Sequence, residues 1–176
     1  SIIVSGGTGG LGLLVGRWLA RCGARKLVLL SRSGAVAQSG GQHWTWLCTE
    51  GSPGTQARLC DVGTEREAVA LMDRGTIELG TTGTVHSAVV LADALLLSQT
   101  QAGLQRVWTT KAHSGWTLHN ASTADQPRQF LVFSSLEALL GSEGHAKYAA
   151  ANACCDGLMR TRRQLGLSGA SVQWGA

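Results

Sequence analysis

A serine, a tyrosine and an asparagine near the end of the chain have the types and spacing needed to protonate a carbonyl oxygen. Ser135 ends an apolar, strand-like run, Tyr148 lies thirteen residues further on, and Asn152 follows one helical turn later on the same face. A serine hydroxyl can hold a carbonyl oxygen while a tyrosine protonates it as hydride arrives from a nicotinamide. A phenol, with a pKa of about 10, needs a nearby cation for this work at neutral pH. The usual place for that cation, four residues after the tyrosine, holds Asn152 instead of a lysine.

A glycine-rich segment, SGGTGGLG, directly follows the first apolar run and opens a stretch of helical period. Glycines there allow a tight turn and let the N-terminus of a helix approach a pyrophosphate. Two registers fit: Gly7, Gly9 and Gly12 match GxGxxG, whereas Gly6, Gly10 and Gly12 match the GxxxGxG spacing of short-chain dehydrogenases. The segment therefore predicts a dinucleotide site, and a purely structural turn is the alternative.

The choice of dinucleotide follows from a missing acid. An NAD site normally offers an Asp or Glu to the ribose 2′-hydroxyl at the end of the second strand, about twenty residues beyond the glycine loop. The first acidic residue of this chain is Glu50, and the strand end carries Ser31, Arg32 and Ser33 instead. A guanidinium between two hydroxyls suits a 2′-phosphate, which favours NADPH over the alternative that Arg32 merely lies along a loop.

The elements that must position these residues alternate between apolar runs and helical stretches. This alternation predicts an α/β fold, a Rossmann-like doubly wound parallel sheet with helices on both faces. We expect strands at residues 2–5, 26–31, 56–62, 84–90, 129–135 and 170–174, and helices at 10–22, 64–79, 100–120 and 145–165. Residues 33–53 are poorly patterned, and we expect a short helix in a mobile connection there.

Charge argues against nucleic acid as a partner. Lys and Arg outnumber Asp and Glu by 15 to 11, a net charge of +4, but charged residues make up only 15% of the chain and the basic ones are scattered. The one basic group, Arg160, Arg162 and Arg163, falls late in a predicted helix. We interpret it as a solvated helix end favoured by the macrodipole, with a partner surface as the alternative.

Cysteine and histidine usage is typical of a cytoplasmic protein without a metal. The five cysteines include no CxxC pair, so reduced core thiols are expected, and the five histidines lack ligand spacing. No apolar run predicts a membrane span or a signal peptide. The chain opens at Ser1 without a methionine and ends just after a strand-like run, so we expect residues 1–176 to be a catalytic domain taken from a longer chain.

The combination of motifs resembles the ketoreductase domain of a modular polyketide synthase. It is also similar to the β-ketoacyl reductase domain of animal-type fatty acid synthase, above all at LLSRSG and at the terminal VQWGA. In these families the Asn and Lys of the usual short-chain group exchange places. The resemblance therefore implies that Lys111, in VWTTKAHSGWTLH, supplies the cation and that Asn152 is not a defect. Lys147 is the competing cation, but adjacent helical positions point about 100° apart, so it should face solvent.

The resemblance also implies the remaining site residues. Asp61 and Val62 match the segment that meets the adenine, and His86, Ser87 and Ala88 match a stretch that lines the cofactor. Val89 replaces a glycine usual in polyketide ketoreductases and could crowd the nicotinamide ribose. Cofactor contacts are expected from Gly6, Thr8, Gly9, Gly10, Leu11, Gly12, Ser31, Arg32, Ser33, Asp61, Val62, His86, Ser87 and Ala88, and substrate contacts from Asp93 and Ser134.

Two markers of product configuration point to the so-called B type, which delivers the D-configured hydroxyl. The LDD motif of that type reads Leu91, Ala92, Asp93 here, and the tryptophan of the A type is replaced by Leu140. Glu143 and Lys147 depart from the proline and asparagine that usually accompany the B type.

The leading hypothesis is an NADPH-dependent β-ketoacyl reductase that acts on a thioester tethered to an acyl carrier protein, with other synthase domains in cis. Expected partners include no nucleic acid, membrane or metal. A substrate lid is expected to follow residue 176 in the parent chain. The alternatives are a discrete short-chain dehydrogenase acting on a free small molecule and an inactive nucleotide-binding structural module.

Overall fold

The computed structural model describes residues 1–52, 54–73, 81–124 and 126–175. Their core is a six-stranded parallel sheet with strand order β3-β2-β1-β4-β5-β6, which confirms the predicted doubly wound fold. The strands are β1 (Ile2–Ser5), β2 (Leu27–Ser31), β3 (Gln56–Leu59), β4 (Gly83–His86), β5 (Gln129–Ser135) and β6 (Ala170–Trp174).

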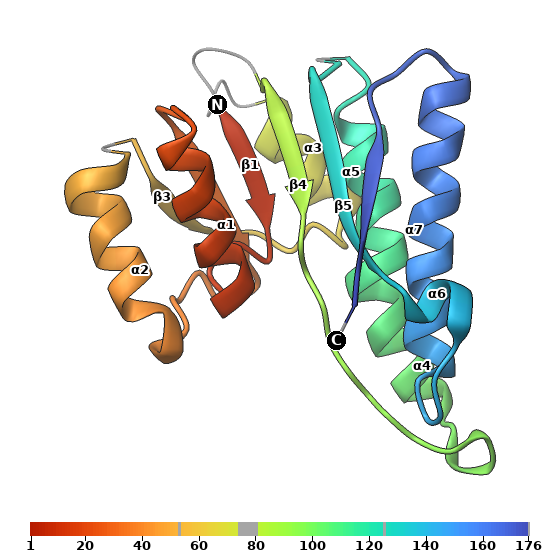
Figure 1. Cartoon of the computed structure of the whole chain (residues 1–176). Helices are drawn as coiled ribbons and strands as arrows, with labels where there is room; N and C mark the ends of the chain where they lie inside the picture. Colours follow the sequence, from red (N-terminus) through yellow and green to blue (C-terminus); the bar gives the residue numbers. More distant parts are fainter. Residues whose placement is uncertain (53, 74–80, 125, 176) are drawn as a thin grey trace.

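Helices cover the sheet from both sides. They are α1 (Gly10–Arg21), α2 (Gly41–Trp46), α3 (Glu65–Asp73), α4 (Gln101–Trp108), α5 (Ser114–Ala121), α6 (Glu137–Leu140) and α7 (Ala146–Gln164). Short 3₁₀ turns occur at Gln38–Gly40 and Leu96–Ser98, and π turns at Leu47–Gly51 and Thr109–His113. Figure 1 shows α1 and α2 on one face of the sheet and α3, α4, α5 and α7 on the other.

The alternation of side chains along each strand builds two separate cores. On β2, Val28 and Leu30 pack in the cluster that includes Leu118 of α5, Leu158 and Met159 of α7. The intervening Leu27 and Leu29 pack in the cluster that includes Leu13 and Leu19 of α1. Burying each such side chain contributes about 1.5–3 kcal/mol, so strands that are apolar on both sides favour a sheet covered on both faces.

Several predicted boundaries needed revision. The third and fourth strands are shorter than the predicted 56–62 and 84–90, because the chain leaves the sheet where it forms the pocket wall. The helix predicted at 64–79 is α3 as far as Asp73, and the rest of that prediction lies outside the described residues. The helix predicted at 100–120 is confirmed, but it contains the π turn Thr109–His113. The poorly patterned 33–53 segment contains α2 and a π turn, which confirms a short helix there.

The basic group Arg160, Arg162 and Arg163 was interpreted as a solvated helix end, and this interpretation was wrong for Arg162. Arg160 and Arg163 are exposed, but Arg162 is 1% exposed. Its guanidinium donates hydrogen bonds to Ser168 O and to Nδ1 of His119, and it lies 4.0 Å from the centroid of the Phe130 ring. Arg162 therefore joins α7 to α5 and β5 from inside the protein.

The carboxyl ends of all strands meet at one edge of the sheet, the lower edge in Figure 1. Ligands of open α/β sheets bind outside this edge, where the strand order reverses. Here the reversal lies between β1 and β4, at the glycine-rich segment.

Candidate active site

The glycine loop closes tightly at two positions. Gly6 has φ +72°, and a Cβ on it would lie 2.7 Å from Cα of Ala88. A Cβ on Gly12 would lie 2.3 Å from the Gly6 carbonyl oxygen. Gly6, Gly10 and Gly12 line the pocket at this edge, whereas Gly7 is buried against Leu29 and does not. The geometry thus favours the GxxxGxG register.

The first helix presents free N–H groups to this pocket. Helix α1 begins at Gly10, its N-cap is Gly9, and no side chain caps it. Its first turn also contains no acidic residue. Unsatisfied N–H groups and the positive end of the helix dipole together suit an anion such as a pyrophosphate.

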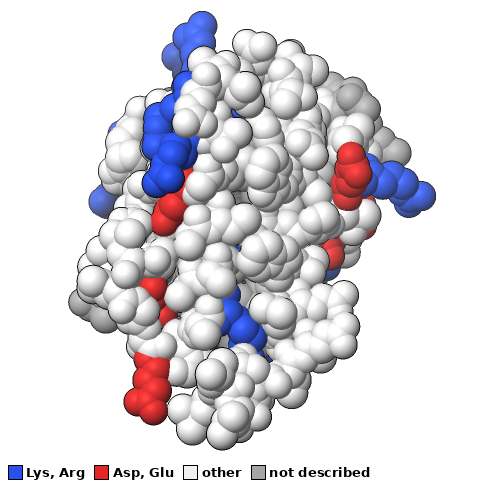
Figure 2. All heavy atoms as spheres, turned by 90° about the vertical axis from the view of Figure 1, so that its right-hand side faces the viewer, with Lys and Arg blue, Asp and Glu red and all other residues white. Residues whose placement is uncertain are grey.

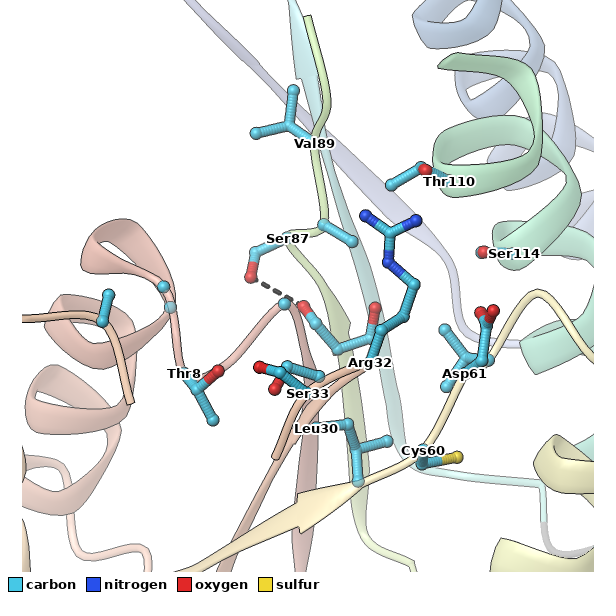
Figure 3. Close-up of a pocket in the computed structure, with 18 of the residues that line it drawn as sticks. Thr8, Leu30, Arg32, Ser33, Cys60, Asp61, Ser87, Val89, Thr110 and Ser114 are labelled. Atoms are coloured by element: carbon cyan, nitrogen blue, oxygen red, sulfur yellow. Dashed lines mark hydrogen bonds between the residues drawn. The ribbon is translucent and has the colours of Figure 1, made fainter. Parts of the chain in front are cut away.

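A pocket of about 790 Å³ extends from the glycine loop across the ends of β2 and β3. All of the predicted cofactor-binding residues except His86 line it. In Figure 3, Arg32 reaches across the pocket toward Thr110, and Asp61 points toward Ser114. The volume is in the range of a small-molecule or cofactor site.

The end of β2 offers a cation and two hydroxyl groups. Arg32 and Ser33 are exposed, and both line the pocket. The hydroxyl oxygens of Ser31 and Ser33 accept hydrogen bonds from the backbone N–H groups of Gly34 (3.0 Å) and Ala35 (3.2 Å). These bonds leave each hydroxyl proton free to be donated to a ligand.

His86 is a correction to the predicted cofactor contacts. Its side chain is 0% exposed and does not line the pocket. Because side chains alternate along β4, the imidazole points into the protein while the neighbouring Ser87 contributes to the pocket wall. There the Ser87 hydroxyl donates a hydrogen bond to Ser5 O at 2.8 Å (Figure 3).

Sequence reasoning missed one wall of the pocket, which comes from α4 and the π turn. Its members share one helix face: Ala102, Gln105, Arg106, Thr109 and Thr110, with Ser114 beyond them. The spacing i, i+3, i+4, i+7, i+8 is the signal that could have found them.

Val89 also lines the pocket and is 46% exposed.

Ser135 ends β5, and Tyr148 and Asn152 lie in the first two turns of α7; none of the three lines the pocket. Ser135 is buried at the end of β5, and its hydroxyl accepts a hydrogen bond from Glu137 N at 3.2 Å. The hydroxyl of the half-buried Tyr148 makes no hydrogen bond within the described residues. Asn152 is 0% exposed; its Nδ2 donates to Tyr148 O at 3.0 Å, while its Oδ1 has no partner. An unpaired buried carbonyl oxygen is costly, so Asn152 is poised to accept a hydrogen bond.

Lys111 lies inside the protein, within the π turn. It is 3% exposed, and its Nζ donates a hydrogen bond to Ala88 O at 3.3 Å. Burial lowers the pKa of this ammonium from 10.5 to about 8, partly offset by Cys155 and Asp156. No hydrogen bond joins Lys111 to Tyr148 in the part of the chain that the structure describes.

Lys147 is a second correction, because the prediction that it faces solvent is wrong. The side chain is 8% exposed. A Cβ on Gly103 would lie 3.0 Å from Lys147 Nζ, so the ammonium lies against the first turn of α4. Helix α4 packs on α7 at this point, and Gly103 provides the room.

The predicted substrate residue Asp93 belongs to a cluster that sequence reasoning missed. Its Oδ2 lies 3.4 Å from His145 Nε2, and His145 Nδ1 lies 2.8 Å from Glu137 Oε2. The hydrogen bond to Glu137 is the main reason that the pKa of His145 is raised. The His145 ring also contacts the Tyr148 ring edge-to-face, with centroids 6.4 Å apart. The position of His145, three residues before Tyr148, was the feature of the sequence that could have identified it as part of the site.

Ser134 is the second of the two predicted substrate residues. It is 3% exposed, and its hydroxyl has no partner. Adjacent residues on β5 point to opposite faces, so Ser134 shares the face of Val132 rather than that of Ser135. The geometry does not support a substrate contact from Ser134.

The surface and the residue clusters add three findings. Figure 2 shows charged side chains in small separate groups, with uncharged surface between them. Within the described ranges no group of three or more His, Cys, Asp or Glu could hold a metal ion, and all five cysteines are free. In those same ranges no helix is long and apolar enough to cross a membrane.

The family model described as "KR domain" matches residues 1–176. The chain is 39% identical over 175 residues to a phenolphthiocerol/phthiocerol polyketide synthase of Mycobacterium tuberculosis, covering 98% of this chain and 8% of that protein. It is 33% identical over 176 residues to a naringenin synthase of Pestalotiopsis fici, covering 99% of this chain and 6% of that protein.

Solved structures agree with these relatives. An A1-type ketoreductase is similar with a TM-score of 0.91 at 36% identity, covering 99% of this chain and 37% of that one. An N-terminal ketoreductase from the macrolactin assembly line has a TM-score of 0.90 at 30% identity, covering 99% of this chain and 36% of that one. The pocket, the helix N-terminus and the Ser135–Tyr148–Asn152 spacing thus occur in a chain that belongs to the KR (ketoreductase) domain family of polyketide synthases.

Proposed function

We propose that this ketoreductase domain uses NADPH to reduce a β-ketoacyl thioester, carried on an acyl carrier protein domain, to the β-hydroxyacyl thioester. The observation that carries the proposal is one continuous pocket. It runs from Arg32, at a strand end without an acid, past the glycine loop to Ala88, whose carbonyl oxygen holds the Lys111 ammonium. When bound, NADPH would supply the hydride.

The residues of the pocket fit each part of that dinucleotide. The free N–H groups at the start of α1 suit the pyrophosphate, and the close packing at Gly6 and Gly12 lets it approach the backbone. Arg32 suits a 2′-phosphate. The end of β2 carries no Asp or Glu that would repel this phosphate. Asp61 and Val62, at the end of β3, fit the adenine end of the pocket.

Residues outside the pocket lining have the chemistry for the carbonyl. Ser135 holds the carbonyl oxygen, and Tyr148, whose hydroxyl makes no hydrogen bond with the other described residues, donates the proton. The ammonium of Lys111 favours the negative charge left on the tyrosine. The unpaired Oδ1 of Asn152 can accept a hydrogen bond and so help to order the polar groups of Ser135, Tyr148 and Lys111. Asp93 is proposed to lie at the substrate side, held by His145.

The relatives support the proposed substrate class and partners. Several relatives are named as polyketide synthases or their subunits and are many times the length of this chain, which supports an acyl carrier protein and other synthase domains in cis as the proposed partners. An inactive structural module is disfavoured because Ser135, Tyr148, Lys111 and Asn152 are all present. The exchanged lysine and asparagine disfavour a discrete dehydrogenase acting on a free small molecule.

The test has two parts. Titration of the protein with NADPH and NADH should show a clear preference for NADPH. Addition of a short β-ketoacyl thioester should then oxidise NADPH at a rate proportional to protein, and product configuration, proposed as the D-configured hydroxyl, is read by chiral chromatography. Binding of NADPH without any reduction, in a polypeptide that also contains the neighbouring domains, would favour the inactive module.

A further inference from the structure

His86 makes a hydrogen bond with each of its two ring nitrogens, deep inside the protein. Nδ1 lies 2.7 Å from the hydroxyl oxygen of Ser5, which is its neighbour across the β1–β4 pair. Nε2 lies 2.9 Å from the carbonyl oxygen of Lys111. A Cβ on Gly115 would lie 3.7 Å from the imidazole, so a glycine of α5 leaves room for the ring. Both nitrogens of this buried ring are therefore satisfied, one by β1 and the other by the backbone of Lys111.

The partners fix the tautomer of His86. A backbone carbonyl oxygen can only accept, so the proton must be on Nε2, which donates to Lys111 O. Nδ1 is then unprotonated and accepts the hydroxyl proton of Ser5. Burial, followed by the nearby charge of Lys111, lowers the pKa of His86 to about 3, which keeps the ring neutral at working pH.

The residue that accepts the hydrogen bond from His86 is Lys111, which supplies the amine of the candidate site. Lys111 lies in the π turn Thr109–His113, where the helix departs from its regular path. Its carbonyl oxygen accepts from His86 and lies 3.7 Å from Cys155 Sγ of α7. Its ammonium donates to Ala88 O, two residues after His86. The last residue of β4 therefore binds the backbone of Lys111, and Ala88, just after β4, binds the tip of its side chain.

We propose that His86 is a positioning residue for Lys111: its Nε2–H fixes the π turn so that the ammonium is held at the wall of the cofactor pocket. The role rests on the proposed function of Lys111 in proton transfer. His86 itself touches neither substrate nor cofactor, and acts by linking the strand before the glycine loop, through Ser5, to the helix that carries the amine.

Two substitutions separate the two hydrogen bonds. In His86→Gln the amide nitrogen can occupy the place of Nε2 and still donate to Lys111 O. In His86→Asn the shorter amide can meet Ser5 but cannot reach Lys111 O. Both replace a buried ring by a buried amide, so their losses of stability should be similar. Thr84→Ala, a buried change two residues away on the same strand and outside the site, is the control for loss of core packing.

The main readout is the pKa of Lys111, measured by NMR with ¹³C-labelled lysine, because it needs no turnover. We expect His86→Gln and Thr84→Ala to keep the low pKa of about 8, and His86→Asn to return it toward the ordinary value as the turn loosens. NADPH affinity should stay within about twofold in all three, whereas kcat should fall by about tenfold to a hundredfold in His86→Asn only.

Two outcomes would overturn the proposal: equal Lys111 pKa values in folded His86→Asn and His86→Gln, or a ¹⁵N spectrum of the unaltered protein that shows the Nδ1–H tautomer. The second measurement decides even where a variant does not fold. Should the protein lack reductase activity altogether, the proposed function fails, while the pKa comparison still tests the link from His86 to Lys111.

Discussion

The ammonium of Lys111 donates a hydrogen bond to the carbonyl oxygen of Ala88, 3.3 Å away. Ala88 lines the pocket, and Lys111 is 3% exposed, so a positive charge from one helix is held inside the protein at the pocket wall. Helix α7, which contains Tyr148 and Asn152, packs against the π turn that carries Lys111. This arrangement supports a site assembled from residues far apart in the sequence, and each of its parts can be tested.

Replacing Tyr148 by phenylalanine should remove the proton donor alone. Its hydroxyl makes no hydrogen bond within the described structure, so the thermal midpoint of unfolding should change little. We expect kcat to fall by about 10²–10⁴-fold while NADPH affinity is retained, measured by fluorescence titration. Unchanged turnover would show that another group donates the proton.

Arg32→Glu should reverse the preference between the two dinucleotides. The change would remove the proposed charge-assisted hydrogen bond to the 2′-phosphate and add repulsion, so the ratio of NADPH to NADH affinity should fall by at least about tenfold. Arg58→Glu is the matched control, because Arg58 is on the adjacent strand, bonds to Gln56 and does not line the pocket. If both variants shift the ratio equally, net charge rather than a phosphate contact explains the effect.

The two buried lysines can be ranked by parallel alanine variants. Lys111→Ala should lower kcat more than Lys147→Ala, since only Lys111 contacts a residue of the pocket wall. Both remove a buried ammonium, so each serves as the stability control for the other. The reverse order of kcat would assign the cation to Lys147 of α7, which lies against α4.

The pH dependence of kcat should report Lys111. With its pKa lowered to about 8, the amine is charged below that pH and loses its charge as pH rises, so kcat should decline on the alkaline side of about pH 8. Lys111→Arg keeps the charge at all accessible pH values, and its alkaline decline should move upward. An identical alkaline limb in both proteins would attribute the decline to another group.

Much of the fold was predictable because its signals are local. The strands β5 and β6 were predicted with their observed bounds, and α1 to within one residue, since continuous apolar runs and helical periods mark them. The π turn around Lys111 was not predictable from periodicity, because one extra residue in a turn leaves no local signature. Helix α6 was not predictable either, because it is only four residues long.

The errors in the site came from contacts between elements. Lys147 was assigned to solvent because only its offset from Tyr148 was considered, whereas α4 covers that side of α7 and Gly103 leaves space for the amine. His86 was assigned to the cofactor by resemblance, but its partners are Ser5 across the sheet and Lys111 on a distant helix. Such partners depend on packing, which sequence spacing alone does not determine.

The most direct test measures NADPH oxidation by a β-ketoacyl thioester in a polypeptide that contains residues 1–176 and the neighbouring domains. The reaction is monitored through the decrease in NADPH absorbance. The proposed mechanism predicts consumption of NADPH with a matching yield of β-hydroxyacyl thioester. In Tyr148→Phe it predicts that this reaction is lost although the variant still binds NADPH. Tight NADPH binding with no thioester product, or equal product from the Tyr148→Phe variant, would contradict it.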